Sequence, residues 1–564
     1  MLAPSRASDP GVLDSGEGTH RPDEAPMLIA LPWILAAFQQ AKPASAPQAP
    51  RLVVMVIVDQ LIPEQLQRLG PYLDGGFGRF LKQGAVFWTA TVDYANTETG
   101  PGHATVATGR YPKSHGIVGN QFVDRELGQL VYCVGDANAH PVTADGSDAT
   151  TGSVSPANLR GDALGDLLKA ANAASKAVTI AGKDRAAVLL GGRKPDAAVW
   201  WDMRAGGFTT STYYGDKLPD FVSVWNKAWS ERAVGWEWTS ELPGDPASFG
   251  TAPDDRPGES GRFGRTLPRR LPEQIDQLAG AVFSSPLIDY FTLELAALAV
   301  DTLHLGQDDV VDFLGLSLSG CDAVGHAHGP DSVEVTDLLL RDDRELGRLF
   351  ARLDELVGAG RWVACLSADH GVLDLPEALR ARGIGARRVP GSEMKALSTS
   401  VKEAVDALDT TGADLKFAFV EQGFYFDEAA ATAAGLDPKS LREAIAAAAE
   451  ETPDIAGAYT ADELARPVDD PWMLLYERCM APGRSPDVAL RPEPWLLFEM
   501  AEGTSHGSPY PYDRRVPLAF LGPKVRAQGR FDAASPTDAV PTLLQLIGQA
   551  PPAAGLDGRV LDVD

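Results

Sequence analysis

Short continuous runs of apolar residues alternate along the chain with segments of helical periodicity. Five such runs stand out, at residues 51–58, 178–181, 310–318, 362–367 and 495–500. A short apolar run rich in β-branched residues is typical of a parallel strand buried on both faces. Leucines spaced at i, i+3 and i+4 over residues 333–357 indicate a helix between two of these runs. The pattern predicts an α/β fold with a doubly wound, mostly parallel central sheet and helices on both faces.

Side chains that carry chemistry follow the ends of these predicted strands. They are Asp59; Lys183 and Arg185; Asp322 and His326; Asp369 and His370; and His506. Ligands of doubly wound sheets bind outside the carboxyl ends of the strands. Taken singly, an Asp after a strand is commonly a turn or helix-cap residue. Their convergence on one sheet edge nevertheless predicts a functional site there.

The remaining histidines are assigned to structure. We treat His20, His140 and His304 as background, and expect packing or hydrogen-bonding roles for His103 and His115. His328 forms a His-Ala-His pair with His326, but Asp322 and His326 already supply ligands there. We therefore expect His328 either to support the ligands from behind or to be structural.

The segment 96–109 offers a nucleophile. Pro101 suits a helix start and Gly109 a helix end, which predicts a short helix over residues 102–108. Thr99 then lies at the helix N-terminus, where free N–H groups and the helix dipole stabilise an alkoxide and attract phosphate. A threonine hydroxyl needs a base or a metal to react. Two alternatives stay open, namely an ordinary capping role for Thr99 and Thr97 as the reactive residue.

Charge and cysteine content narrow the possible functions. The 564 residues include 50 Lys and Arg against 77 Asp and Glu, a net charge of −27. Nucleic-acid binding rests mainly on cations that neutralise phosphates, so a nucleic-acid partner is not expected. Four cysteines form no CxxC motif, and any zinc must be held by His and carboxylate side chains.

Composition also suggests how the chain is organised. Residues 1–26 are rich in Gly, Pro, Ser and charge, and an apolar run at 27–38 precedes the possible cleavage site Ala44-Ser45-Ala46. We expect residues 1–46 to be a disordered extension plus a signal peptide, giving a periplasmic or secreted protein; a buried N-terminal helix is the alternative. We expect residues 47–564 to form one domain without stable membrane insertion.

Two segments, about 191–284 and 376–489, read as cap insertions over the site. The first is rich in aromatic residues. They could stack on a nucleoside or aryl group, but packing within a small cap explains them better.

The motifs resemble, in their order, those of the alkaline phosphatase superfamily. The similar segments are Val58-Asp59-Gln60, Thr99-Gly-Pro-Gly-His103, Gly116-Ile-Val-Gly-Asn120, Lys183-Asp-Arg185, Asp322-x-x-x-His326, Asp369-His370-Gly371 and His506-Gly507. The resemblance is greatest to the phosphate-irrepressible, PafA-like alkaline phosphatases, which use a threonine nucleophile. It extends from about residue 50 to the C-terminus.

This resemblance implies two Zn²⁺ ions per chain. Asp59, Asp369, His370 and the Thr99 oxygen would hold one ion, and Asp322, His326 and His506 the other. Asn120, Lys183 and Arg185 would bind the non-bridging phosphoryl oxygens. The implied activity is hydrolysis of small phosphate monoesters through a covalent phosphothreonine. Independently of the resemblance, a ligand set of nitrogen and oxygen with several imidazoles suits zinc better than magnesium or calcium.

Two other branches of the superfamily and one non-enzymatic role are alternatives to this activity. The sulfatase branch needs a C-x-P-x-R context that no cysteine here has. The phosphodiesterase and nucleotide pyrophosphatase branch also uses threonine but lacks the Lys-x-Arg pair, so Lys183 and Arg185 favour a dianionic monoester. A metal- and phosphate-binding protein without turnover is the non-enzymatic alternative, although no ligand position of the motif is missing.

Overall fold

The computed structural model describes residues 49–564 except 144–151, 205, 262–263, 410–411, 414, 422 and 553. The expected extension and signal peptide at 1–46 lie outside the described residues.

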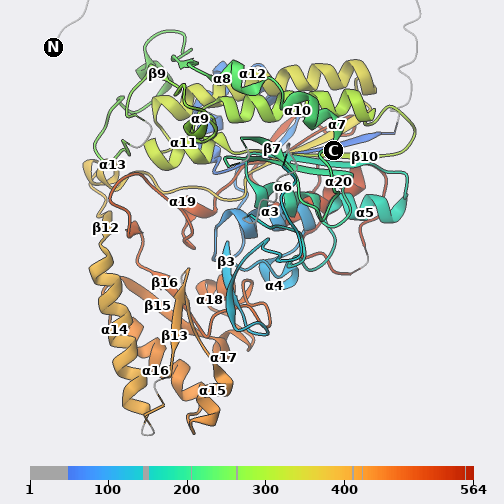
Figure 1. Ribbon diagram of the computed structural model, residues 1–564. Helices are drawn as coiled ribbons and strands as arrows, with labels where there is room; N and C mark the ends of the chain where they lie inside the picture. Colours follow the sequence, from blue (N-terminus) through green and yellow to red (C-terminus); the bar gives the residue numbers. More distant parts are fainter. Residues whose placement is uncertain are drawn as a thin grey trace, which may run out of the picture. The chain divides into compact units, whose positions relative to one another are not determined.

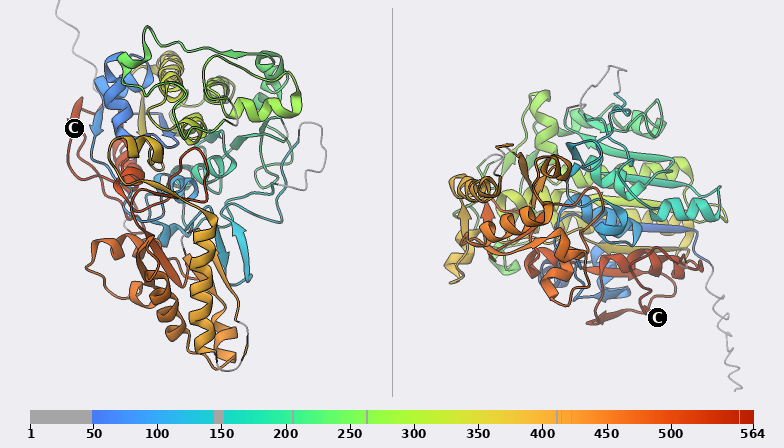
Figure 2. Two further views of the ribbon diagram at one scale, coloured as in Figure 1. Left: turned by 90° about the vertical axis from the view of Figure 1, so that its left-hand side faces the viewer. Right: turned by 90° about the horizontal axis from the view of Figure 1, so that it is seen from below.

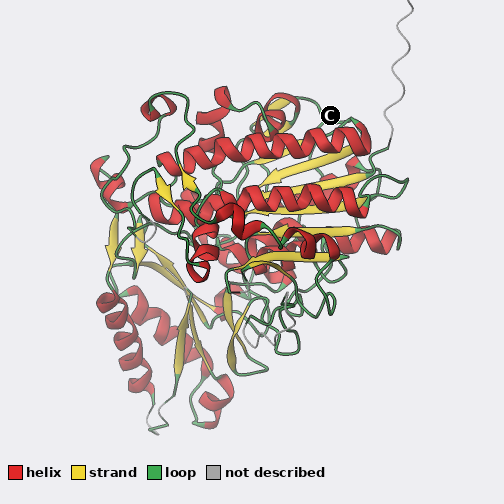
Figure 3. Cartoon of the chain, turned by 45° about the horizontal axis from the view of Figure 1, so that its top comes forward, coloured by secondary structure: helices red, strands yellow, loops and turns green. Residues whose placement is uncertain are grey.

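A sheet covered by helices forms the centre of the structure (Figures 1 and 3). It has nine strands, in the order β19-β2-β18-β11-β1-β10-β5-β6-β7. The five strands β11, β1, β10, β5 and β6 are mutually parallel. β18 runs antiparallel to β11, and β7 antiparallel to β6. The strands are β1 (Leu52–Val58), β2 (Ala85–Phe87), β5 (Ala177–Ala181), β6 (Ala197–Asp202), β7 (Gly207–Thr209), β10 (Asp312–Leu318), β11 (Trp362–Ser367), β18 (Leu518–Leu521) and β19 (Gln528–Arg530). The predicted doubly wound, mostly parallel sheet is confirmed.

Both faces of this sheet are covered, as the unbroken apolar runs require. Alternate residues of β1 enter different cores: Val54 and Val56 pack with one cluster, and Val53 and Met55 with the other. The first cluster includes α10 (Leu287–Leu303) and α12 (Val333–Leu353). The second includes α5 (Leu164–Ala171) and α20 (Ala539–Leu546). Every residue of β1 is buried because each of its faces has a core.

Residues 495–500 do not form a strand of the central sheet, which corrects the prediction. Their strand, β17 (Leu496–Phe498), pairs instead with β12 (Arg387–Val389) in a separate two-stranded sheet. Strand β17 has three residues and lies between Trp495 and Glu499, whose φ angles are positive, at 67° and 57°. An apolar run this short specifies an extended backbone but not its partner.

The helix expected over residues 102–108 begins earlier. It is α3 (Thr99–Thr108), with Glu98 as N-cap and Gly109 in the left-handed conformation at its end. Pro101 falls in the first turn, where backbone N–H groups have no partner within the helix, so proline is tolerated there.

Part of the segment 191–284 belongs to the central sheet, since it contains β6 and β7. Its aromatic residues pack against one another, as expected: Trp201 lies edge-on to Phe208, Trp225 and Trp229. Phe291 of α10 contacts Trp201 and Trp225 of this cluster and so connects it with the core that α10 covers.

The segment 376–489 builds most of a separate module (Figure 2, orange). A four-stranded antiparallel sheet, in the order β13-β14-β16-β15, packs with α14 (Gly391–Leu408) and α16 (Pro438–Glu450) around its own apolar core. The strands are β13 (Phe417–Val420), β14 (Gly423–Phe426), β15 (Ile455–Thr460) and β16 (Val488–Pro492).

Within the described residues, no single helix is long and apolar enough to cross a membrane. One bent pair, α9 (Ile275–Phe283) with α10 at 84°, meets the criteria of length and composition only.

Candidate active site

The carboxyl ends of four parallel strands converge on one site. Asp59 follows β1, Lys183 follows β5, Asp322 follows β10 and Asp369 follows β11. His506 arrives on the loop after β17 rather than from the central sheet.

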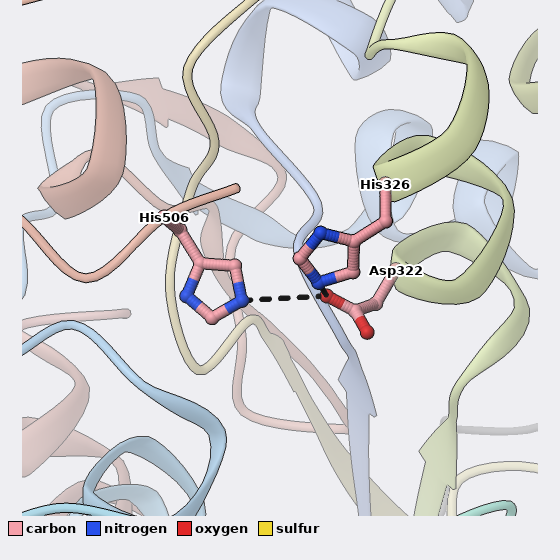
Figure 4. Close-up of side chains that lie close together, drawn as sticks. All are labelled: Asp322, His326 and His506. Carbon is pink, nitrogen blue, oxygen red and sulfur yellow. Dashed lines mark ion pairs between the residues drawn. The ribbon is translucent and has the colours of Figure 1, made fainter. Parts of the chain in front are cut away.

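The first candidate metal cluster consists of Asp322, His326 and His506, whose donor atoms lie within 4.8 Å of one another (Figure 4). Helix α11 (Gly320–His328) places Asp322 and His326 on one face, because residues four apart in a helix are neighbours. Asp322 Oδ1 lies 3.0 Å from His326 Nε2 and 3.6 Å from His506 Nε2.

A second cluster adjoins the first. Asp59, Asp322 and His370 again bring donor atoms within 4.8 Å of one another. His370 Nε2 lies 3.5 Å from Asp59 Oδ1 and 3.4 Å from Asp369 Oδ2. The ring of His370 stacks on that of His506 with centroids 3.5 Å apart, so the two clusters are in contact.

All three histidines are oriented in the same way. His326 Nδ1 lies 2.7 Å from the Thr504 carbonyl, His506 Nδ1 2.8 Å from the Thr97 carbonyl, and His370 Nδ1 3.0 Å from the Gly371 carbonyl. A carbonyl can only accept a hydrogen bond, so Nδ1 of each ring carries a proton, and Nε2 is the nitrogen that the neutral ring offers to a metal. Histidines that bind metals are held in this manner.

The burial and the charge of these donor atoms suit a bound cation. Among the described residues, Asp59 Oδ1 and His370 Nε2 are buried without a hydrogen-bond partner, which costs free energy unless a ligand satisfies them. Burial lowers the pKa of His370 to about 3, which keeps its imidazole neutral. Burial and the charges of Asp322 and Asp369 raise the pKa of Asp59 well above its usual value. A cation bound beside Asp59 would offset both effects, because an opposite charge favours the ionised carboxylate.

Lys183 lies between the two clusters. Its Nζ donates to Asp59 Oδ2 at 2.5 Å and to Asp322 Oδ2 at 2.6 Å. Lys183 thus pairs with these two buried site residues and not with the nearby carboxylates Asp184 or Asp196.

Thr99 and Arg185 meet at the start of α3. Arg185 Nη2 donates to Thr99 Oγ1 at 3.2 Å, and Thr99 is buried. Asn120 reaches the same helix end, since its Oδ1 accepts from the Gly100 N–H at 2.8 Å. Thr97 is engaged elsewhere, because its hydroxyl donates to the Ser508 carbonyl at 2.9 Å. The geometry favours Thr99 over Thr97 as the reactive hydroxyl.

Two residues that sequence reasoning missed support this arrangement. Gln60, with a positive φ of 73°, donates from Nε2 to Asp322 Oδ1 at 2.8 Å. Tyr132 donates to Asp184 Oδ1 at 2.7 Å and accepts from Arg185 Nη1 at 3.4 Å. Gln60 directly follows Asp59 and could have been noticed, whereas no sequence feature connects Tyr132 with Arg185.

Three further histidines, His103, His115 and His328, make packing or hydrogen-bonding contacts. His103 lies 2.8 Å from Ser317 Oγ and 3.1 Å from Asp369 Oδ2. His115 is buried beside the Thr105 hydroxyl at 3.1 Å. His328 is buried near Glu259 and Glu334 and belongs to neither candidate metal cluster.

Comparison with known proteins shows which family the chain belongs to. Residues 53–498 match the family of type I phosphodiesterases and nucleotide pyrophosphatases. Alkaline phosphatase PafA of Elizabethkingia meningoseptica is 30% identical over 92% of this chain and 96% of its own length. Alkaline phosphatase PhoV of Synechococcus elongatus is 30% identical over 93% and 96%. A crystal structure of wild-type PafA superimposes with a TM-score of 0.81 over 92% of this chain and 99% of that one.

The chain therefore belongs to the type I phosphodiesterase and nucleotide pyrophosphatase family of the alkaline phosphatase superfamily. It is a hydrolase of the alkaline phosphatase type, and the resemblance to PafA-like enzymes is confirmed.

Proposed function

We propose that the protein hydrolyses small phosphate monoesters through a covalent phosphothreonine intermediate, with two Zn²⁺ ions per chain. The observation that carries this proposal is the convergence of three Nε2 lone pairs and buried carboxylates beside the contact between Arg185 and Thr99. At the level of the family, the alkaline phosphatase relatives support monoester hydrolysis.

The donor sets divide between two ions. Asp59, Asp369, His370 and the Thr99 oxygen would hold one, and Asp322, His326 and His506 the other. Two such ions supply Lewis acidity to the attacking and leaving oxygens of an in-line displacement. Carboxylates and neutral imidazoles together are a donor set that zinc accepts readily.

The protein's own side chains bind the phosphoryl group, and Thr99 accepts it from the ester. Thr99 Oγ loses its proton to solvent and forms a bond to phosphorus while the bond from phosphorus to the ester oxygen breaks, and the alcohol leaves with a proton from solvent. Water then attacks phosphorus, which breaks the bond to Thr99, restores its hydroxyl and releases inorganic phosphate. Arg185 can donate two parallel hydrogen bonds to non-bridging oxygens. The Asn120 amide and the Lys183 ammonium add further donors at the same phosphoryl group. The N-terminal N–H groups of α3 add positive potential at Thr99.

Substrate charge separates this proposal from the diesterase alternative. A monoester presents a dianionic phosphoryl group, whereas a diester replaces one of those oxygens and carries one charge less. Lys183 and Arg185 therefore favour the monoester.

The proposal is tested by turnover of p-nitrophenyl phosphate beside bis-p-nitrophenyl phosphate, with and without a chelator. We expect faster monoester hydrolysis, its loss with chelator, and its recovery on adding zinc. Faster hydrolysis of the bis-ester would support the diesterase alternative. Zinc binding without turnover of either ester would support the non-enzymatic one.

Metal content gives a second prediction. We expect two zinc ions per wild-type chain by elemental analysis and one in His506→Ala, since that variant keeps only two side-chain donors in its cluster. The control is His140→Ala, an exposed histidine outside both clusters, which should retain two. One zinc or none in the metal-replete wild type would contradict the assignment.

We also propose that the protein is exported, on the grounds of the apolar run at 27–38 and the Ala44-Ser45-Ala46 site. Mass spectrometry of protein from a bacterial host should find a mature N-terminus near residue 47. An intact chain retained in the cytoplasm would contradict export.

A further inference from the structure

Helix α11 supplies two of the three ligands of one cluster, Asp322 in its first turn and His326 one turn later. The position of its N-terminus therefore sets where both donors lie. No side chain of α11 or of its N-cap residue Ser319 caps this end of the helix.

A carboxylate from another helix takes that place. Asp289 of α10 accepts hydrogen bonds from the Ser319 N–H at 2.7 Å and from the Gly320 N–H at 3.0 and 3.1 Å. Asp289 is completely buried. These N–H groups would otherwise lack partners, because the first turn of a helix has no acceptor for them.

The approach is close enough to require glycine at position 320. A Cβ there would lie 2.4 Å from Asp289 Oδ2 and 2.8 Å from Leu338 Cδ1. Such separations are far inside van der Waals contact, so a larger residue at 320 would push the carboxylate from the helix end. Gly320 and Asp289 thus form one fitted contact.

A third helix completes the arrangement. Leu338 of α12 packs against the start of α11, since its Cδ1 lies where a Cβ of residue 320 would meet it. On the same helix, burial and the charge of Asp289 raise the pKa of Asp342 well above its usual value. Helices α10 and α12 thus both approach the N-terminus of α11.

We propose that Asp289 is a positioning residue for the metal cluster of Asp322, His326 and His506, which it orients by fixing the first turn of α11. This inference rests on the proposed function, because it takes the cluster to be a zinc site. Asp289 itself touches neither metal nor substrate.

The neighbouring residue on α12 provides a matched control. Asp343 accepts from the N–H groups of Asp74, Gly75 and Gly78 at 2.9, 2.7 and 2.8 Å, and so holds the N-terminus of α2 (Gly76–Gln83). Like Asp289, it is a buried carboxylate that caps a helix across a gap in sequence. Helix α2 carries no residue of the site, so a purely structural role would make the two positions equivalent.

The experiment measures zinc affinity by competition with a chromogenic chelator, together with the midpoint of thermal unfolding. In Asp289→Leu we expect one of the two zinc ions to bind about 10- to 100-fold more weakly, as is common when a group that orients metal ligands is lost. Asp289→Asn, whose amide oxygen still accepts hydrogen bonds, should stay within about threefold of wild type. Asp343→Leu should lower the unfolding midpoint but leave both zinc affinities unchanged.

Gly320→Ala tests the same contact from the other side, and decides the matter if Asp289→Leu does not fold. It should weaken the same zinc ion. The inference is overturned if the folded Asp289→Leu and Gly320→Ala variants bind both ions as wild type does, or if Asp343→Leu weakens zinc equally. A wild-type protein that binds no zinc would instead overturn the proposed function.

Discussion

Replacing Lys183 and Arg185 together with alanine is expected to slow hydrolysis of p-nitrophenyl phosphate by about two to four orders of magnitude. A hydrogen bond to a charged group contributes ~1.5–3 kcal/mol, which corresponds to about one to two orders of magnitude in rate for each side chain. Hydrolysis of bis-p-nitrophenyl phosphate should fall much less, because a diester has one terminal oxygen and one charge fewer to offer these cations. The measurement is kcat/KM for both esters.

The single variants show which contact is responsible. Lys183 also bridges Asp59 and Asp322, so its removal can disturb the metal site, whereas Arg185 contacts Thr99 and Tyr132. Arg185→Ala should therefore keep the wild-type zinc content, while its kcat/KM still falls more for the monoester than for the diester. Equal and large losses on both esters, with zinc lost, would indicate a metal-site defect. Small and equal losses would show that neither cation binds the phosphoryl group.

Thr99→Ala is expected to abolish turnover and the covalent intermediate together. The hydroxyl is the proposed acceptor of the phosphoryl group, so without it no phosphothreonine can form. The measurement is acid quench during turnover of a ³²P-labelled monoester, followed by peptide mapping. We expect label on Thr99 in the wild type and none on the variant. The kcat of the variant should be lower by at least about three orders of magnitude, as is usual when an activated nucleophile is removed.

Thr97→Ala is the matched control, two residues away. Its hydroxyl donates to the Ser508 carbonyl, so its loss should cost about 1 kcal/mol of stability while label and turnover persist. Thr99→Ser should also retain label, because it keeps a hydroxyl at the same position. Label that persists in Thr99→Ala but disappears in Thr97→Ala would show that the nucleophile had been assigned to the wrong threonine.

Several features followed from the sequence because local pattern and burial specify them. The run 51–58 became the central strand β1, since an unbroken β-branched stretch can only be satisfied with a core on each face. Asp59, Asp322 and Asp369 then reached one site, because parallel strands end at a common edge. The four-residue spacing of Asp322 and His326 likewise placed both on one face of a helix.

Other features depended on contacts between distant segments. The run 495–500 paired with β12 instead of the central sheet, because a short extended segment takes whichever edge the surrounding loops present. His506 therefore reached the site on a loop, which no strand pattern could indicate. The choice between Thr97 and Thr99 rested on the Ser508 carbonyl and on Arg185, each remote in sequence.

The sequence by itself thus determined the sheet, the edge at which the chemistry gathers and the types of side chain delivered there. Periodicity and strand direction are local properties of the chain, so a single sequence displays them. The tertiary structure decided which nitrogen of each histidine faces the cluster, through the carbonyls of Thr97, Gly371 and Thr504. It also decided that Asp289 holds the helix of Asp322 and His326. Such hydrogen bonds mostly join groups far apart in sequence, and they exist only once the chain has folded.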